Sequence, residues 1–137
     1  MRKLVVLFIA LIGFQCQAEL IVRDAIIRLL PPGVPNTSVY FEIQNTGQNS
    51  EVLVSASSDI AQRIEMHNHI MSGDSMRMEQ IHAVEIAAGE TLVFEPMGKH
   101  LMVFGLHQPL AEGHTVTVKL HTRSGLTVSV PAEVSRP

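Results

Sequence analysis

Apolar and polar residues alternate along much of the chain after residue 19, and this pattern predicts strands. The alternation is clearest in residues 115–121 and 126–130, where every second side chain is apolar. No stretch has a comparable helical period, and residues 57–63 allow at most one helical turn. Turn signals separate the apolar segments at intervals of roughly 8 to 12 residues, which is typical of an all-β sandwich or closed sheet. The predicted strands cover residues 20–30, 37–44, 52–56, 63–71, 76–86, 91–95, 100–106, 115–122 and 126–134.

The first eighteen residues differ in composition from the rest of the chain. Arg2 and Lys3 precede an uncharged apolar run over residues 4–14, and a small-x-small pattern ends at Ala18. This order predicts a secretory signal peptide over residues 1–18, cleaved after Ala18. A lipoprotein signal acylated on Cys16 is the competing interpretation, although the residue before that cysteine is a glutamine where a small residue is wanted. The apolar run is too short for a permanent span, which needs ~20 residues, so no stable membrane insertion is expected.

Length and composition favour one domain over residues 19–137. The whole chain has 137 residues and a formal charge of −3, and removal of Arg2 and Lys3 with the signal peptide makes the charge −5. The remaining basic residues are scattered, so nucleic acid is not an expected partner. The single cysteine is removed as well. The mature chain therefore has no disulfide, no thiolate nucleophile, no thiolate zinc site and no type-1 copper site.

Histidine and methionine are the residues that suggest chemistry. They concentrate in two segments, residues 66–78 and residues 97–102. Taken singly, a methionine is usually a core residue and a histidine usually a surface residue. In the second segment, however, His100 and Met102 are separated by one residue on a predicted strand, so both side chains project from the same face.

The first segment adds a second pair of donors, provided that the turn has even length. The predicted strands 63–71 and 76–86 flank a turn at residues 72–75 and read as a hairpin. If residues 71 and 76 close the turn, His67 lies opposite Gln80 with Met78 as its diagonal neighbour. A two-residue loop at Ser72-Gly73 instead puts His67 directly opposite Met78. An odd loop would place these two side chains on opposite faces. In the even registers His67 falls on the polar face, which predicts a surface site.

These four donors, His67, Met78, His100 and Met102, select for one kind of ion. Thioether sulfur is a poor ligand for Zn²⁺, Mg²⁺ or Ca²⁺, whereas Cu(I) accepts both thioether and imidazole. Three further residues of the hairpin lie on the ligand face in the even registers and are candidates for secondary contacts with the ion: His69, Met71 and Met76. The alternative is that they are solvent-exposed residues without a ligand role. The remaining histidines have no methionine partner at a useful spacing and are interpreted as surface residues: His82, His107, His114 and His121.

The spacing His67-x10-Met78-x21-His100-x-Met102 resembles the signature of the periplasmic copper chaperones of the PCu(A)C type. The resemblance extends over most of the mature chain, including residues 40–47, 86–91 and 109–113. It implies a cupredoxin-like Greek-key β-sandwich. A monomer is expected, although the sequence does not determine the oligomeric state. Phe104 stands where relatives often have another methionine, and the His- and Met-rich C-terminal tail that gives some relatives a second site is missing. One Cu(I) per chain is therefore expected.

The resemblance also implies a role. The leading hypothesis is a non-enzymatic periplasmic carrier that delivers Cu(I) to a respiratory oxidase, commonly to the dinuclear site on subunit II, or to another copper assembly protein. Two alternatives stay open, a periplasmic copper-sequestering resistance protein and a secreted β-sandwich interaction module with incidental Met and His. A copper oxidase or monooxygenase is disfavoured, because no cysteine is present and a chain starting at Glu19 has no N-terminal histidine.

Overall fold

The computed structural model describes residue 10 and residues 19–136, so the predicted signal peptide, except for Ala10, lies outside the described residues. Every regular element in the described part is a strand, as predicted. No helix there has the length and apolar character that crossing a membrane requires. The strands are β1 (Leu20–Arg28), β2 (Thr37–Asn45), β3 (Glu51–Ser57), β4 (Ala61–Ser72), β5 (Ser75–Ile81), β6 (Val84–Ile86), β7 (Thr91–Phe94), β8 (His100–Leu106), β9 (Thr115–Thr122) and β10 (Thr127–Ser135).

The structure differs from the sequence analysis at two places. Residues 57–63, which could have formed one helical turn, contain a tight connection at Asp59 and Ile60 instead, because β3 and β4 pair as antiparallel neighbours, with Ala56 opposite Ile64. The predicted strand 76–86 is broken at residues 82 and 83. Its first part, β5, pairs with β4, whereas its second part, β6, pairs with β3. One continuous strand could not reach both partners.

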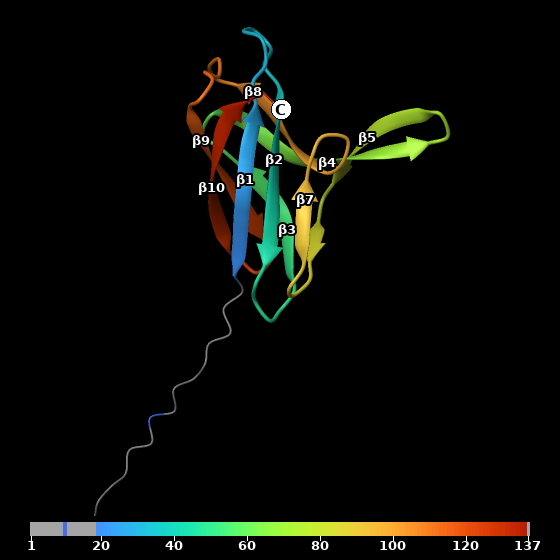
Figure 1. The fold of residues 1–137 in the computed structure, drawn as a ribbon, viewed down its shortest axis with the longest axis vertical. Helices are drawn as coiled ribbons and strands as arrows, with labels where there is room; N and C mark the ends of the chain where they lie inside the picture. Colours follow the sequence, from blue (N-terminus) through green and yellow to red (C-terminus); the bar gives the residue numbers. More distant parts are fainter. Residues whose placement is uncertain (1–9, 11–18, 137) are drawn as a thin grey trace, which may run out of the picture.

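The strands form one sheet that closes on itself. Their order is β5-β4-β8-β2-β1-β10-β9-β3-β6, β7 pairs with β2, and β4 pairs with β3 as well as with β8 (Figure 1). The only parallel pairing in the described residues joins β1 to β10. The side chains that alternate inward fill the interior, and the largest fully buried aliphatic ones are Ile27, Ile43, Leu53, Ile86, Leu101 and Leu120. Burial of each such side chain stabilises the fold by about 1.5–3 kcal/mol.

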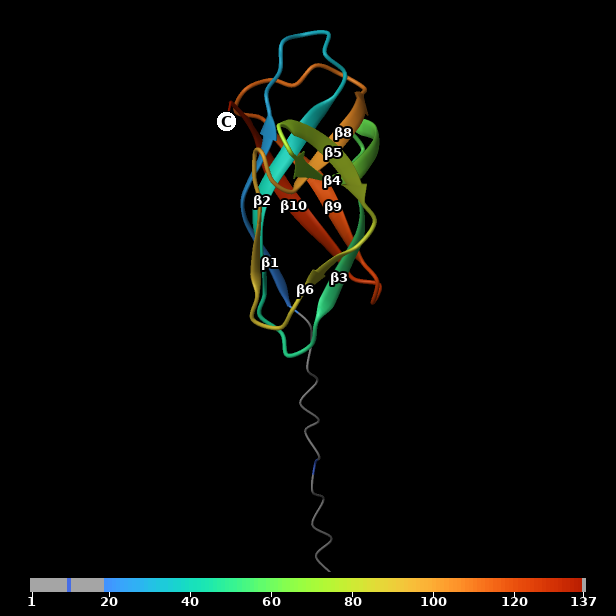
Figure 2. The same cartoon turned by 90° about the vertical axis from the view of Figure 1, so that its right-hand side faces the viewer.

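Strand β4 has two roles along its length. Residues 61–67 pair with β8 inside the closed sheet, whereas residues 66–72 pair with β5. The β4–β5 hairpin therefore leaves the body of the molecule, as Figure 1 shows at the upper right, and it faces the viewer in Figure 2. His67 lies where these two regions overlap, with β5 on one side and β8 on the other.

Candidate metal centre

The strand register brings the four predicted donors to one face of β5, β4 and β8. His67 lies directly opposite His100 across the β4–β8 pairing, and Met102 is two residues further along β8. On the other side of β4, Met78 lies opposite His69, which makes Met78 the diagonal neighbour of His67. Directly opposed residues project from the same face of a sheet. His67 is thus central, with His100 beside it and a thioether on each diagonal.

The hairpin has the even turn on which the prediction depended. Met71 pairs with Met76, and Ser72 pairs with Ser75 around a two-residue turn. Of the two even registers, the observed one places His67 opposite Gln80. Gly73 occupies the turn with φ +63°, a left-handed conformation that glycine adopts without strain.

Three imidazole rings gather at this face. The ring centroids of His67 and His100 are 6.1 Å apart with an interplanar angle of 29°. His69, which the sequence suggested only as a secondary contact, has its ring centroid 5.1 Å from that of His100. Burial, with a smaller contribution from the nearby charges of His69 and His67, lowers the pKa of His100 and favours its neutral ring, which is the form of imidazole that binds metals.

A carboxylate orients the His67 ring. His67 Nε2 lies 2.9 Å from Glu65 Oε2, and Arg63 Nε lies 3.1 Å from Glu65 Oε1. The hydrogen bond from His67, aided by Arg63, lowers the pKa of Glu65, so this residue is an acceptor-only carboxylate. The proton of neutral His67 therefore resides on Nε2, and the lone pair is on Nδ1. A carboxylate on the outer nitrogen of a ligand histidine raises its basicity and fixes its orientation.

His100 is oriented by the backbone instead. Its Nδ1 donates to the carbonyl oxygen of Gly98 at 2.9 Å, so the lone pair of the neutral ring lies on Nε2. Only 3% of the residue is exposed, and this burial lowers the pKa of His100. The predicted surface location is therefore wrong for His100, because its strand lies between β4 and β2 inside the sheet. Met78 does lie at the surface, where half of the residue is exposed.

In the part of the chain that the structure describes, two buried side-chain nitrogen atoms lack a hydrogen-bond partner, His67 Nδ1 and His69 Nδ1. An unsatisfied buried polar atom costs about 1–3 kcal/mol and calls for an explanation such as a missing ion. In His67 this atom carries the lone pair that the Glu65 bond assigns to it. Within residue 10 and residues 19–136, no group of three or more His, Cys, Asp or Glu side chains is arranged to hold a metal ion. The candidate donor set is mixed, imidazole and thioether, and such a set suits a soft ion.

Other side chains complete the surroundings of the donors, and sequence analysis did not single out most of them. The Ser38 hydroxyl donates to Met102 Sδ at 3.4 Å, which orients the thioether. The Arg63 guanidinium lies 4.2 Å from the centroid of the Phe104 ring, so Phe104 helps to hold Arg63 against Glu65. The position of Glu65, two residues before His67 on the same face, was a usable signal. The sequence contains no comparable signal for Ser38, because this residue belongs to a strand distant in the sequence.

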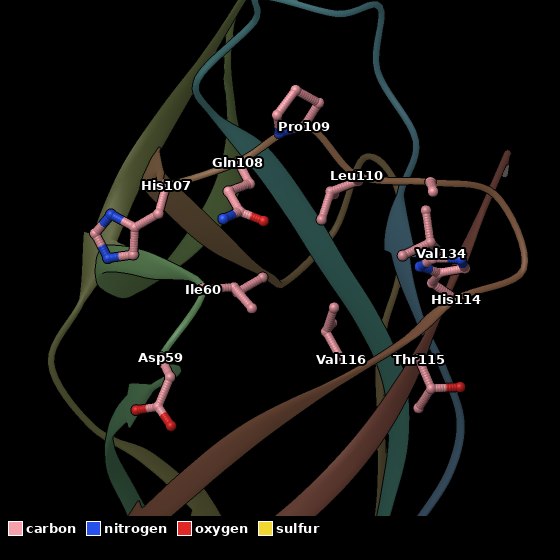
Figure 3. Close-up of a pocket in the computed structure, with 11 residues that line it drawn as sticks. Asp59, Ile60, His107, Gln108, Pro109, Leu110, His114, Thr115, Val116 and Val134 are labelled. Carbon is pink, nitrogen blue, oxygen red and sulfur yellow. The ribbon is translucent and has the colours of Figure 1, made fainter.

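A separate pocket of about 350 Å³ lies between the β3–β4 turn and the β8–β9 connection, away from these donors. Figure 3 shows that His107 and His114 project from opposite sides of it, and its interior is lined by apolar groups such as Ile60 and Val116. These two imidazoles do not converge. Their placement fits the interpretation of both as surface residues.

Comparison with known proteins identifies the family of this chain. Residues 20–134 match the family described as putative lipoprotein LpqE-like. The chain belongs to the LpqE-like family. Among its relatives is the putative lipoprotein Lxx21020 of Leifsonia xyli subsp. xyli (strain CTCB07), which is 31% identical over 100 residues. That match includes 71% of this chain and 60% of the relative, so the chain spans about three fifths of the relative's length.

Solved structures agree with this assignment. The solution structure described as CuI-DR1885 from Deinococcus radiodurans is 28% identical to this chain and superposes with a TM-score of 0.69. The match covers 91% of this chain and 83% of that chain. The copper-bound PCuAC domain from PmoF2 has a TM-score of 0.71 at 14% identity, with 86% and 93% covered, and supports the fold alone. The predicted resemblance to the PCu(A)C type and the cupredoxin-like, single-domain all-β fold are confirmed for this LpqE-like protein.

Proposed function

We propose that this LpqE-like protein is a copper carrier that binds one Cu(I) through His67, Met78, His100 and Met102. The observation that carries the proposal is the register that places His67 opposite His100, with a methionine on each diagonal. Two imidazoles and two thioethers suit Cu(I) and disfavour harder ions. Copper also appears in the descriptions of two similar structures, CuI-DR1885 and the PmoF2 domain.

The arrangement suits transfer better than catalysis. All four proposed ligands are neutral, so an incoming donor can replace each one without moving a buried charge. The two imidazoles are covered, whereas Met78 is half exposed, so a partner protein would meet this thioether first. We therefore favour a non-enzymatic carrier over an oxidase or monooxygenase.

The recipient that we propose is a respiratory oxidase subunit, at the dinuclear copper site of subunit II, or another copper assembly protein. This recipient follows from the resemblance to the PCu(A)C chaperones. The periplasmic location that we propose rests on the predicted signal peptide together with that resemblance, and we propose a monomer. The family description as lipoprotein-like also gives weight to acylation on Cys16 as the alternative to cleavage after Ala18. Either signal would export the copper site.

The direct test of the metal site is a competition titration. The purified apo protein is titrated with Cu(I) against a chromogenic Cu(I) chelator, and in parallel with Zn²⁺ against a zinc chelator. We expect one tightly bound Cu(I) per chain and much weaker Zn²⁺ binding, because the thioethers add little to the affinity for a harder ion. Equal or tighter binding of Zn²⁺ would contradict the ligand assignment.

Delivery and sequestration are separated by the phenotype of a deletion strain. If the protein delivers copper, its loss lowers terminal oxidase activity when copper is scarce, and added copper restores the activity by mass action. If it sequesters copper, its loss leaves the oxidase active and makes cells sensitive to excess copper. Oxidase activity and copper tolerance measured in the same strain decide between the two roles.

A further inference from the structure

The outer part of the β4–β5 hairpin carries soft donors that the proposed site does not use. Met71 and Met76 face each other directly across the hairpin, and they are 62% and 44% exposed. Directly opposed side chains have Cβ atoms about 4.5–5.5 Å apart. Two flexible thioethers at this separation can reach a common ion.

His69 supplies a third donor next to this pair. It lies two residues before Met71 on the same face of β4, directly opposite Met78. Its Nδ1 atom is buried and has no hydrogen-bond partner. His67 Nδ1 is accounted for by the proposed site, whereas His69 is not one of the four proposed ligands. The His69 ring centroid lies 5.1 Å from that of His100, so this imidazole borders the inner donors as well as the thioether pair.

Beyond His67, the charged side chains of the two hairpin strands project from the opposite face. Arg77 pairs with Ile70 and Glu79 pairs with Asn68, both out of phase with the donors. The donor face between Met71 and His67 thus bears thioethers, imidazoles and the neutral Gln80. A neutral set of this kind offers little to Zn²⁺ or Ca²⁺ and favours a soft monovalent ion.

The donors also recur at regular steps. Met71 with Met76, His69 with Met78, and His67 with His100 form successive rows along one face. Rows two residues apart in a strand are separated by about 6.6 Å. The series begins near the tip of the hairpin, which projects from the body of the molecule in Figure 1. It ends at the covered imidazoles of His67 and His100.

We propose that His69, Met71 and Met76 form an outer Cu(I) position through which copper enters and leaves the inner site. This inference rests on the proposed function, because the outer position feeds the set of His67, Met78, His100 and Met102. Met78, opposite His69 and diagonal to His67, is the donor that the two positions share. Copper exchanges its ligands one at a time along the face and is never released to solvent between the two positions. The outer position has fewer imidazoles and more exposure, and it binds more weakly than the inner one.

The test is a Cu(I) titration of the purified protein against a weak and a strong Cu(I) chelator. The outer variant is Met71→Leu with Met76→Leu, a swap that conserves volume and typically costs under about 1.5 kcal/mol. The matched control is Ile70→Leu with Arg77→Gln, at the neighbouring pair on the other face of the same hairpin. Met102→Leu serves as the inner variant. Far-UV circular dichroism checks that each variant is folded.

We expect wild type to hold one equivalent against the strong chelator and a second against the weak chelator only. The outer variant loses the second equivalent and keeps the first. When a large excess of the strong chelator is added to strip the first equivalent, the outer variant releases it about tenfold more slowly than wild type, since affinity and exchange rate are set separately. The control behaves as wild type. The outer position would be overturned if wild type bound no second Cu(I), or if the outer variant still bound one. The proposed function would be overturned instead if wild type bound no Cu(I) against the strong chelator.

Discussion

His67 and His100 face each other across the β4–β8 pairing, with their ring centroids 6.1 Å apart, although 32 residues separate them in the chain. Each ring is fixed from its far side, His67 by Glu65 and His100 by the carbonyl of Gly98. These two hydrogen bonds leave one lone pair per ring for a ligand. The inner site that we propose is therefore organised without a bound ion, and several consequences can be measured.

Replacement of either thioether should weaken Cu(I) binding without unfolding the protein. Met78→Leu and Met102→Leu conserve volume and should cost under about 1.5 kcal/mol of stability. Because each removes a soft ligand, we expect the affinity for Cu(I) in a chelator competition to fall by about tenfold or more. Met66→Leu is the matched control, since Met66 faces the core and is 4% exposed. Wild-type affinity in both test variants would show that the methionines are not ligands.

Loss of the Glu65 charge should weaken the site indirectly. Glu65→Gln removes the carboxylate that orients His67 and raises its basicity, and substitutions of such partners lower metal affinity about 10–100-fold. We expect the lower end of that range, because the glutamine oxygen can still accept a hydrogen bond. The nitrogen chemical shifts of His67 should report the altered ring. Glu42→Gln, at the exposed ion pair with Arg23, is the control and should leave affinity unchanged. An equal effect of both substitutions would refute the special role of Glu65.

The stability of the apo protein should fall as the solution is acidified. The pKa of His100 lies below its ordinary value of 6.5, so below pH 6.5 the unfolded chain takes up a proton at this residue before the folded protein does. The stabilising contribution is complete above pH 6.5 and is lost as pH falls towards the lowered pKa. The lowered pKa of Glu65 acts in the same direction below its ordinary value of 4.5. Urea unfolding at pH 7.5 and pH 5.5 measures the effect (about one unit either side of 6.5).

A His100→Phe variant provides the comparison for this pH dependence. If it folds at pH 7.5, its free energy of unfolding should change less between the two pH values than that of wild type. His114→Phe, at an exposed histidine, should retain the wild-type dependence. Equal slopes for wild type and His100→Phe would show that another group causes the acid sensitivity.

Asn45→Ala should destabilise the fold without touching the proposed copper ligands. The buried Asn45 side chain donates to the carbonyl oxygens of Asn49 and Ile86 and accepts from the backbone nitrogen of Gly47. Its removal leaves buried carbonyl groups unpaired, at about 1–3 kcal/mol for each unsatisfied group. The free energy of unfolding of the apo protein should fall accordingly, while Gln108→Ala, at an exposed loop, should stay within about 0.5 kcal/mol of wild type. Unchanged stability of Asn45→Ala would contradict the anchoring role.

The sequence by itself determined the local features of this protein. Strand positions followed from alternation and turn residues, and β8 and β9 have the predicted bounds. The shared face of His100 and Met102 followed from the two-residue period of a strand, and that of His67 and Met78 from the even turn between them. Both depend on side-chain parity, which neighbouring residues fix.

Only the tertiary structure decided how these local pairs combine. The pairing of β4 with β8 joins His67 to His100, and the pairing of β8 with β2 brings Ser38 to Met102. Burial of His100, and the break that frees β5 from β6, follow from the same closure of the sheet. The choice of strand partners minimises exposed apolar surface over the entire core, a sum to which every inward-facing residue contributes. No short segment carries that information, so the site appears only when the sheet closes.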